Sequence, residues 1–468
     1  MPTMRSSKLP THPNSQPRLT VIGGGLAGCE AAWQAAQCGV LVDLYEMRPH
    51  KRGPAHESDF LAELVCSNSM RGAALENAVG LLKEELVRCD SVIVSSAREA
   101  AVPAGGALAV DRERFGTLVE SRLAAHPNVT IHREEVTAIP TEGTVIIACG
   151  PLPSDELSAA IDALVGKKLH YFDAAAPIVA LDSIDESVMY RKSRYEKGDG
   201  DDYLNIPLDR ETYRQFIEDL RTLPKHDPKD FEKNEGTGKI PYFEGCLPIE
   251  EMAMRGEDAL RFGPLKPVGL RHPETGITPH AVVQLRKENA AGTALNLVGF
   301  QTRLTWPAQK EAFGKLPGLA NAEWLRLGVM HRNTFIDSPR LLDADLRLRE
   351  NPRIFFAGQI TGAEGYVEAA ACGCIAGNAA ARELLELPRI GVPEDTALGA
   401  IVAHLQNTTT RDFQPANVTW SYFTPPPGLT KKMDKREKRA RMAERALERI
   451  DEFASARATP STALTAVS

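Results

Sequence analysis

The sequence predicts an α/β fold in which one discontinuous domain is interrupted by an inserted α/β domain. Two segments far apart in the chain carry the same succession of apolar strand, glycine-rich turn and small-residue helix; one begins at residue 18 and the other spans residues 353–385. Between them, residues 190–240 are polar and dense in charges of both signs. Because alternating strands and helices are typical of α/β domains, we expect the outer segments to form one domain and the charged stretch to lie on the surface of the insertion.

The expected domain limits follow from these changes of character. We expect the discontinuous domain to comprise residues 17–173 and 330–425, and the insertion, residues 174–329, to contribute to the functional site. Residues 1–16 are rich in Pro and Ser and lack the apolar core of a signal peptide, so they are expected to form a disordered leader. Residues 426–468 are expected to form a basic helix and a disordered tail.

The composition is that of an ordinary globular protein. The chain has 468 residues, of which 43% are hydrophobic and 25% charged. A net charge of −7 argues against a protein that is basic all over, although a local basic patch remains possible. No apolar run is long enough to cross a bilayer, and the eight scattered cysteines suit reduced thiols better than a disulfide framework. We therefore expect a cytoplasmic protein without a membrane partner.

A glycine-rich turn follows the first predicted strand. In the sequence Gly23-Gly24-Gly25-x-x-Gly28, Gly23 allows a tight turn, Gly25 lets the backbone approach a pyrophosphate, and Gly28 lets helix and strand pack closely. Amide groups at the helix N-terminus would hold the phosphates. These four glycines are predicted to bind a dinucleotide cofactor.

An acidic residue completes this pattern. The second predicted strand, residues 41–45, ends at Glu46, which stands 18 residues after Gly28. A carboxylate at this place accepts hydrogen bonds from the hydroxyls of an unphosphorylated adenosine ribose, which favours FAD or NAD over NADP. The alternative is a glycine-rich turn without a ligand, but the strand, helix, second strand and acid together make that interpretation the weaker one.

Two later segments indicate which dinucleotide is bound. Residues 144–153 form an apolar strand that runs into Gly150, and residues 353–385 add a second helix N-terminus that can face phosphate. This layout resembles the glutathione-reductase-like FAD-binding Rossmann fold, in which a C-terminal strand and helix return to cover the flavin. Gly358, Gln359 and Gly365 are therefore predicted to bind FAD, although Gln359 replaces the acidic residue usual in that fold.

Other motifs are excluded or remain unremarkable. Cys372 and Cys374 are two residues apart on a predicted helix, so they point to different faces and are expected to be packing residues. The histidines and cysteines show no HExxH or paired CxxC pattern, so no metal site is expected. No GxSxG nucleophile elbow is present.

A more specific resemblance rests on six segments between about residues 18 and 425. They are "VIGGGLAGCEAAWQ" (21–34), "LAELVCSNSMRG" (61–72), "YFEGCLPIEEMAMRG" (242–256), "NLVGFQTRLTWPAQK" (296–310), "GVMHRNTFIDSP" (328–339) and "FAGQITGAEGYVEAAACG" (356–373). Together they resemble the folate- and FAD-dependent tRNA uracil-5-methyltransferases. Their length makes them far more specific than a GxGxxG motif alone.

The resemblance implies a reaction and its substrates. The expected activity is methylation at C5 of the T-loop uridine (position 54) of tRNA, with 5,10-methylenetetrahydrofolate as carbon donor, reduced FAD as carrier and reductant, and NADPH or NADH as co-substrate. A sister family modifies the wobble uridine at its 5-position with the same FAD fold. The segments "CSNS" and "EGCLPIE" point away from that alternative.

Two cysteines carry the expected chemistry. Uracil C5 is a poor nucleophile, so a thiolate must first add to C6, and a base must then remove the C5 proton. The resemblance places the nucleophile at Cys246 and the second functional thiol, as base, at Cys66, although the assignment of the two roles stays open. By itself a lone cysteine is more often a small buried residue. The resemblance also places Tyr366 against the flavin ring.

Three polar residues in the matched segments, Asn68, Arg303 and Glu364, have no role assigned by sequence. Two aromatic residues, Tyr242 and Phe243, stand close to Cys246 in the sequence and suggest a stacking surface for a flipped base.

The tRNA partner is expected to leave a mark on the charge pattern. Residues 431–449 hold nine basic and four acidic residues, while Ala443, Ala446, Leu447 and Ile450 form a helical apolar stripe. The basic face would then be available to phosphate, but a solvated charged helix is an equally good interpretation.

Two other classes of protein remain as alternatives. A flavin-dependent oxidoreductase acting on disulfides or amines would have a CxxC motif near the flavin, and none is present. A non-catalytic flavin- or tRNA-binding protein would tolerate alanine at both functional cysteines.

Overall fold

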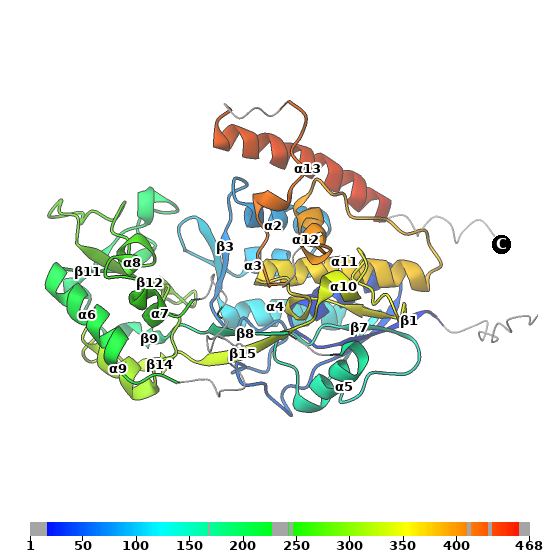
Figure 1. Ribbon diagram of the computed structural model, residues 1–468, viewed down its shortest axis with the longest axis horizontal. Coiled ribbons are helices and arrows are strands. Elements are labelled where there is room, and N and C mark those ends of the chain that lie inside the picture. Colours follow the sequence, from blue (N-terminus) through cyan, green and yellow to red (C-terminus); the bar gives the residue numbers. More distant parts are fainter. Residues whose placement is uncertain are drawn as a thin grey trace, which may run out of the picture.

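The first and last parts of the chain meet in a parallel sheet (Figure 1). The structure is a computed structural model that describes residues 16–166, 169–226, 242, 247–409, 413–428 and 433–457. The sheet has five strands in the order β16 (Ile354–Phe356), β7 (Thr144–Ile147), β1 (Arg18–Ile22), β2 (Leu41–Tyr45) and β6 (Val129–His132), all parallel to their neighbours. Every residue of β7 and β16 is buried, as expected for a parallel sheet covered on both faces. The predicted α/β fold class is confirmed.

Two helices from opposite ends of the chain pack against each other on this sheet. They are α1 (Leu26–Gln37) and α11 (Tyr366–Leu384). A Cβ atom on Gly373 would lie 2.2 Å from the carbonyl oxygen of Ala27, and one on Gly377 would lie 2.5 Å from that of Ala31. The small residues of α11 are therefore required for the close approach of the helices. Cys372 and Cys374 are buried in the same helix, as expected for packing residues.

Further helices and a small sheet complete the part of the molecule around the parallel sheet. The helices are α2 (Ala78–Arg88), α3 (Val92–Glu99), α4 (Arg112–Ala125), α5 (Asp155–Val165), α10 (Ser338–Leu341) and α12 (Ala397–Leu405). The small antiparallel sheet has the order β3 (Ser69–Gly72), β5 (Ala107–Val110) and β4 (Ala101–Val102).

A second, antiparallel sheet lies at the left of Figure 1. Its order is β10 (Tyr190–Arg191), β11 (Tyr203–Leu208), β12 (Ala281–Lys287), β13 (Ala294–Leu297), β9 (Ile178–Ala180) and β14 (Trp324–Arg326). It packs with α6 (Arg210–Thr222), α7 (Ile249–Met254), α8 (Ala259–Phe262) and α9 (Trp306–Gly314) around a hydrophobic core of its own. The antiparallel pair β8 (Leu169–Ala174) and β15 (Met330–Phe335) runs between the two sheets.

Residues 190–226, the described part of the stretch 190–240, are more ordered than the composition suggests. They contain β11, four of whose six residues are buried, and the amphipathic helix α6. Asp209 caps α6 by accepting a hydrogen bond from the amide of Thr212, and Tyr213, Phe216, Ile217 and Leu220 bury one face at helical spacing. The polar residues that dominate the composition occupy the other face.

The basic helix α13 (Lys435–Arg457) lies across α2 at the top of Figure 1. Ala443, Ala446 and Ile450 are buried and Leu447 is partly buried, which confirms the predicted apolar stripe. Arg88 of α2 donates to the carbonyl of Leu447. Residues 1–15 and 458–468, to which the predicted leader and tail belong, lie outside the described residues. None of the helices in the described ranges is long and apolar enough to cross a bilayer.

Candidate active site

The glycine-rich turn between β1 and α1 has three differently used glycines. Gly23 has a φ of +106°, and a Cβ there would lie 2.5 Å from the carbonyl oxygen of Ala148. A Cβ on Gly28 would lie 1.8 Å from the carbonyl oxygen of Gly23, so helix and turn are in direct contact. A Cβ on Gly25, in contrast, would meet no atom within 4 Å. Gly25 therefore faces open space at the N-terminus of α1.

This open space belongs to a first pocket of about 990 Å³, a volume that includes space open to solvent. The pocket lies between the glycine turn, the end of β2, the segment after β7 and the start of α11. Of the residues predicted to bind a cofactor, those that line it are Gly23, Gly25, Glu46, Gly358, Gln359 and Tyr366. Gly24 and Gly28 support the turn from behind, and Gly365 lines a second pocket instead.

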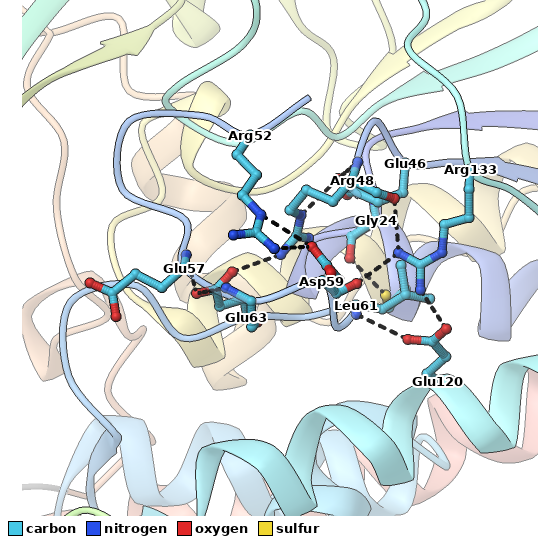
Figure 2. Close-up of polar contacts among 12 residues, drawn as sticks. Gly24, Glu46, Arg48, Arg52, Glu57, Asp59, Leu61, Glu63, Glu120 and Arg133 are labelled. Atoms are coloured by element: carbon cyan, nitrogen blue, oxygen red, sulfur yellow. Dashed lines mark hydrogen bonds and ion pairs between the residues drawn. The ribbon is translucent and has the colours of Figure 1, made fainter. Parts of the chain in front are cut away.

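Glu46 is held in place by its neighbours (Figure 2). The amide of Gly24 donates to its Oε2 at 2.9 Å, and Nε of Arg48 donates to its Oε1 at 2.8 Å. Arg48 is only 1% exposed and also pairs with Glu63 at 2.8 Å. Burial acts to raise the pKa of Glu46, but the hydrogen bonds and charge of Arg48 hold that pKa below its usual value. The carboxylate is thus ionised, and Glu46 lines the pocket. Sequence reasoning missed Arg48, for which the only signal is its place two residues after Glu46.

His56 is a second residue of the first pocket that sequence reasoning missed. It lines the pocket, and its Nδ1 atom is buried without a hydrogen-bond partner among the described residues. Burial and the nearby charge of Arg48 lower the pKa of His56, so the imidazole is neutral. A buried ring nitrogen without a partner costs free energy unless a ligand pairs with it.

A second pocket, of about 880 Å³, adjoins the first and contains Cys66. The two pockets share Val65, Pro151, Gln359 and Tyr366 as lining residues. The hydroxyl of Tyr366 accepts hydrogen bonds from the amides of Cys66 at 2.7 Å and Ser67 at 3.0 Å. Tyr366 is thus the wall between the pockets and an anchor for the Cys66 loop.

Buried polar groups form another wall of the second pocket. Burial and the neighbouring Asp173 raise the pKa of Glu364 to about 8, so this carboxyl group is protonated at neutral pH. Gln359 donates to Glu364 at 2.8 Å, and Tyr171 is also hydrogen-bonded to it. Burial lowers the pKa of His331, which lines the pocket. The wall is suited to hydrogen bonding with an uncharged polar heterocycle.

Cys246 and Phe243 lie outside the described residues, but described residues stand on either side of them. Tyr242 forms a bridge with Phe172 of β8. On the other side, the amide of Ile249, the first residue of α7, donates to the carbonyl of Gln301 at 2.7 Å. Gln301 lines the second pocket. The described residues that flank Cys246 therefore contact elements that border the pocket of Cys66.

Asn68 and Arg303 are two other residues of the segments that resemble the family. Asn68 is fully buried next to Cys66. Arg303 pairs with Glu251 of α7 at 2.7 Å and donates to the carbonyl of His226. No group of three or more His, Cys, Asp or Glu side chains suited to a metal ion occurs in the part of the chain that the structure describes.

Comparisons with known proteins show which proteins this chain is similar to. The family described as "Glucose inhibited division protein A" matches residues 18–388. The methylenetetrahydrofolate--tRNA-(uracil-5-)-methyltransferase TrmFO of Pelobacter propionicus is 57% identical over 430 residues, which cover 92% of this chain and 93% of that protein. The TrmFO of Geobacter sulfurreducens is 55% identical over 435 residues, which cover 93% of this chain and 98% of that protein.

A solved structure shares the fold. Aquifex aeolicus GidA in its form II crystal superimposes with a TM-score of 0.69 at 16% identity, covering 95% of this chain and 74% of that chain. This likeness, which reports fold alone, confirms the predicted Rossmann-like architecture. The much higher identity to the two TrmFO proteins extends over nearly the whole chain and confirms the predicted family. The chain belongs to the methylenetetrahydrofolate–tRNA-(uracil-5-)-methyltransferase (TrmFO) family.

Proposed function

We propose that this protein methylates C5 of the T-loop uridine (position 54) of tRNA, with 5,10-methylenetetrahydrofolate as carbon donor, FAD as cofactor and NADPH or NADH as reductant. The names of the TrmFO relatives support the tRNA and folate substrates. The observation that carries the proposal is the junction of the two pockets at Tyr366, which puts Cys66 beside the space in front of the glycine turn. A reaction on tRNA with a reduced folate would take place in the cytoplasm.

The first pocket fits FAD in three respects. The open space at Gly25 admits a pyrophosphate against the N-terminus of α1, where free amides favour an anion. Glu46 is ionised and has lone pairs left for ribose hydroxyls. The neutral imidazole of His56 lines the same pocket and could hydrogen-bond to an uncharged part of the cofactor. Gly358, Gln359 and Tyr366 would hold the flavin end, and Gly365 would shape the turn beside it. When bound, FAD supplies the redox chemistry of the reaction and carries the one-carbon unit.

The chain's own groups supply the acid–base and nucleophilic steps. The thiolate of Cys246 would add to C6 of the uracil, which makes C5 nucleophilic, and Cys66 would accept the C5 proton before the first thiolate leaves. Tyr366 keeps the Cys66 backbone at the wall between the pockets. The protonated carboxyl of Glu364 and the neutral His331 would offer hydrogen bonds to an uncharged heterocycle entering the second pocket.

The proposal is tested by incubating the protein with tRNA, methylenetetrahydrofolate, FAD and NADPH or NADH, followed by mass spectrometry of the digested tRNA. The expected product is 5-methyluridine confined to the T-loop. A product at the wobble uridine would move the protein to the sister reaction, and methylation that depends on S-adenosylmethionine but not on folate would overturn the proposed carbon donor.

The assignment of FAD as cofactor is tested separately from activity, by the flavin content of the purified protein. The purified protein should be yellow and carry one FAD per chain. A colourless protein that also fails to take up added FAD would contradict the cofactor assignment whatever its activity.

A further inference from the structure

The short loop that carries Cys66 is held from both sheets. From the parallel-sheet side, Tyr366 accepts the amides of Cys66 and Ser67. From the antiparallel sheet, Arg326 of β14 donates to the carbonyl of Val65 at 2.8 Å. Because loops are held mainly by such contacts, the position of the Cys66 thiol depends on residues far from it in sequence.

Arg286 of β12 makes the densest set of contacts from the antiparallel sheet. Its Nε donates to Oδ1 of Asn68 at 3.0 Å, and its Nη2 donates to Oγ of Ser67 at 2.8 Å. Arg286 is only 5% exposed, so water competes little for these hydrogen bonds. The guanidinium fork therefore grips the two residues that directly follow Cys66.

Asn68 links this contact to the backbone of the small sheet and of the antiparallel sheet. Its Nδ2 donates to the carbonyl of Val110 in β5 at 3.0 Å and to that of Lys287 in β12 at 2.8 Å. With Arg286 on its Oδ1, the amide uses both donors and its acceptor, and its side chain is fully buried. A side chain with every polar atom occupied in this way has one low-energy orientation.

We propose that Arg286 is a positioning residue for Cys66, through which the antiparallel sheet sets the place of the thiol in the second pocket. The inference rests on the proposed role of Cys66. Arg286 itself does not line the pocket, and its effect passes through Ser67 and Asn68. Loss of the guanidinium leaves the buried Oδ1 of Asn68 without its donor, removes one of the two donors to Oγ of Ser67, and so weakens the hold of the antiparallel sheet on the loop.

The experiment compares Arg286→Met, which keeps the apolar stem, with Arg286→Lys, which keeps one charged donor. Asp202→Ala serves as the matched control. Asp202, which directly precedes β11, is also buried and also contacts a segment outside the antiparallel sheet, since it accepts a hydrogen bond from the amide of Gly105. Among the described residues, no hydrogen bond links Asp202 to residues 65–69. Three quantities are measured: the alkylation rate of Cys66 by iodoacetamide, followed on its peptide by mass spectrometry; kcat and KM for tRNA; and the melting temperature.

We expect Arg286→Met to raise the alkylation rate of Cys66 about tenfold and to lower kcat by about tenfold to a hundredfold, with KM for tRNA nearly unchanged. Arg286→Lys should recover part of both effects. Asp202→Ala should change the melting temperature about as much as Arg286→Met while leaving the alkylation rate and kcat near wild type. The split between kcat and KM and the rescue by lysine distinguish positioning from general destabilisation.

Two results would overturn the inference. One is an alkylation rate and kcat in Arg286→Met that match those of Asp202→Ala. The other, decisive if Arg286→Met does not fold, is an Arg286→Lys protein whose melting temperature falls as in Asp202→Ala while its alkylation rate and kcat stay at the wild-type values, because the lost fork would then stabilise the fold without positioning the thiol. Full activity in Cys66→Ala would instead contradict the proposed function of Cys66, while the alkylation comparison would still decide whether Arg286 holds the loop.

Discussion

The two adjoining pockets are built in different ways. In the first, a glycine turn, a helix N-terminus and one acid come from a single stretch from β1 to Glu46, and the segment after β7 and the start of α11 complete the lining. The second is made of side chains from widely separated segments, including Cys66, Asp173, His331 and Glu364. A turn that faces a pyrophosphate needs only local geometry, whereas chemistry on a base needs several groups to converge, and convergence requires the whole fold.

The largest effect is expected when the two cysteines predicted to act in the second pocket are replaced. In a T-loop RNA that carries 5-fluorouridine there is no C5 proton to remove, so turnover should stall after thiolate addition and leave a covalent adduct. Cys66→Ala should form this adduct but lose turnover with normal tRNA by about a thousandfold or more, while Cys246→Ala should form no adduct. Mass spectrometry of the cross-linked peptide provides the measurement. An adduct on Cys66 would exchange the two roles, and full activity in both variants would make the thiols packing residues.

The next largest effect distinguishes two kinds of glycine in the turn between β1 and α1, one that faces the pocket and one that packs against backbone. Gly25 has an extended backbone (φ −75°) and open space around its missing side chain, so Gly25→Val should fold and yet bind FAD at least about a hundredfold more weakly. Gly28→Val forces a side chain into the backbone of Gly23 and should lower the melting temperature severely. Flavin absorbance and thermal unfolding measure the two outcomes. If Gly25→Val kept its full complement of FAD, the pyrophosphate would not bind at this turn.

A smaller effect concerns pH. Because burial raises the pKa of Glu364 to about 8, the folded protein keeps a proton that the unfolded chain releases near pH 4.5. Raising the pH between these values therefore favours the unfolded state, by up to about 1.4 kcal/mol for each pH unit. Glu364→Gln, which cannot ionise, should gain stability relative to wild type as the pH rises from 5 to 8. Denaturant unfolding at several pH values tests this, and parallel pH profiles for the two proteins would show that Glu364 is ionised in the folded state.

The smallest expected effect concerns α13. Arg445 pairs with Asp395 at 3.2 Å, and Arg449 lies 3.7 Å from the same carboxylate, so the second half of the helix is partly neutralised by the protein itself. We expect Lys435, Lys438 and Arg439 in the first half to contact phosphate, although Arg439 also donates to the carbonyl of Glu76 at 3.3 Å. Reversing these three charges should weaken tRNA binding by about tenfold and reduce its salt dependence, whereas Arg445→Gln should mainly lower stability. Binding measured at several salt concentrations with an unchanged slope would make α13 a solvated helix without an RNA role.

The sequence determined the glycine turn of the first pocket and the helix α13 because both depend on spacing along a short stretch. A strand, a glycine turn and a helix can bind a dinucleotide in only one local way, and a stripe at helical spacing buries one face wherever the helix docks. The family resemblance also predicted that Cys66 is functional. They carried no information on Arg48 or His56, since a charged residue or a histidine in a loop has no pattern of its own.

Only the tertiary structure decided what surrounds Cys66. Asn68 and Arg286 are 218 positions apart, and nothing in either local sequence selects the other among the many arginines of the chain. Their contact exists because the antiparallel sheet docks β12 against the loop, and that docking is set by two hydrophobic cores rather than by any motif. The same holds for Tyr366, which meets the amide of Cys66 across 300 positions because α11 folds back onto the sheet begun by β1. Spacing within a motif is a property of the chain, whereas contact between motifs is a property of packing.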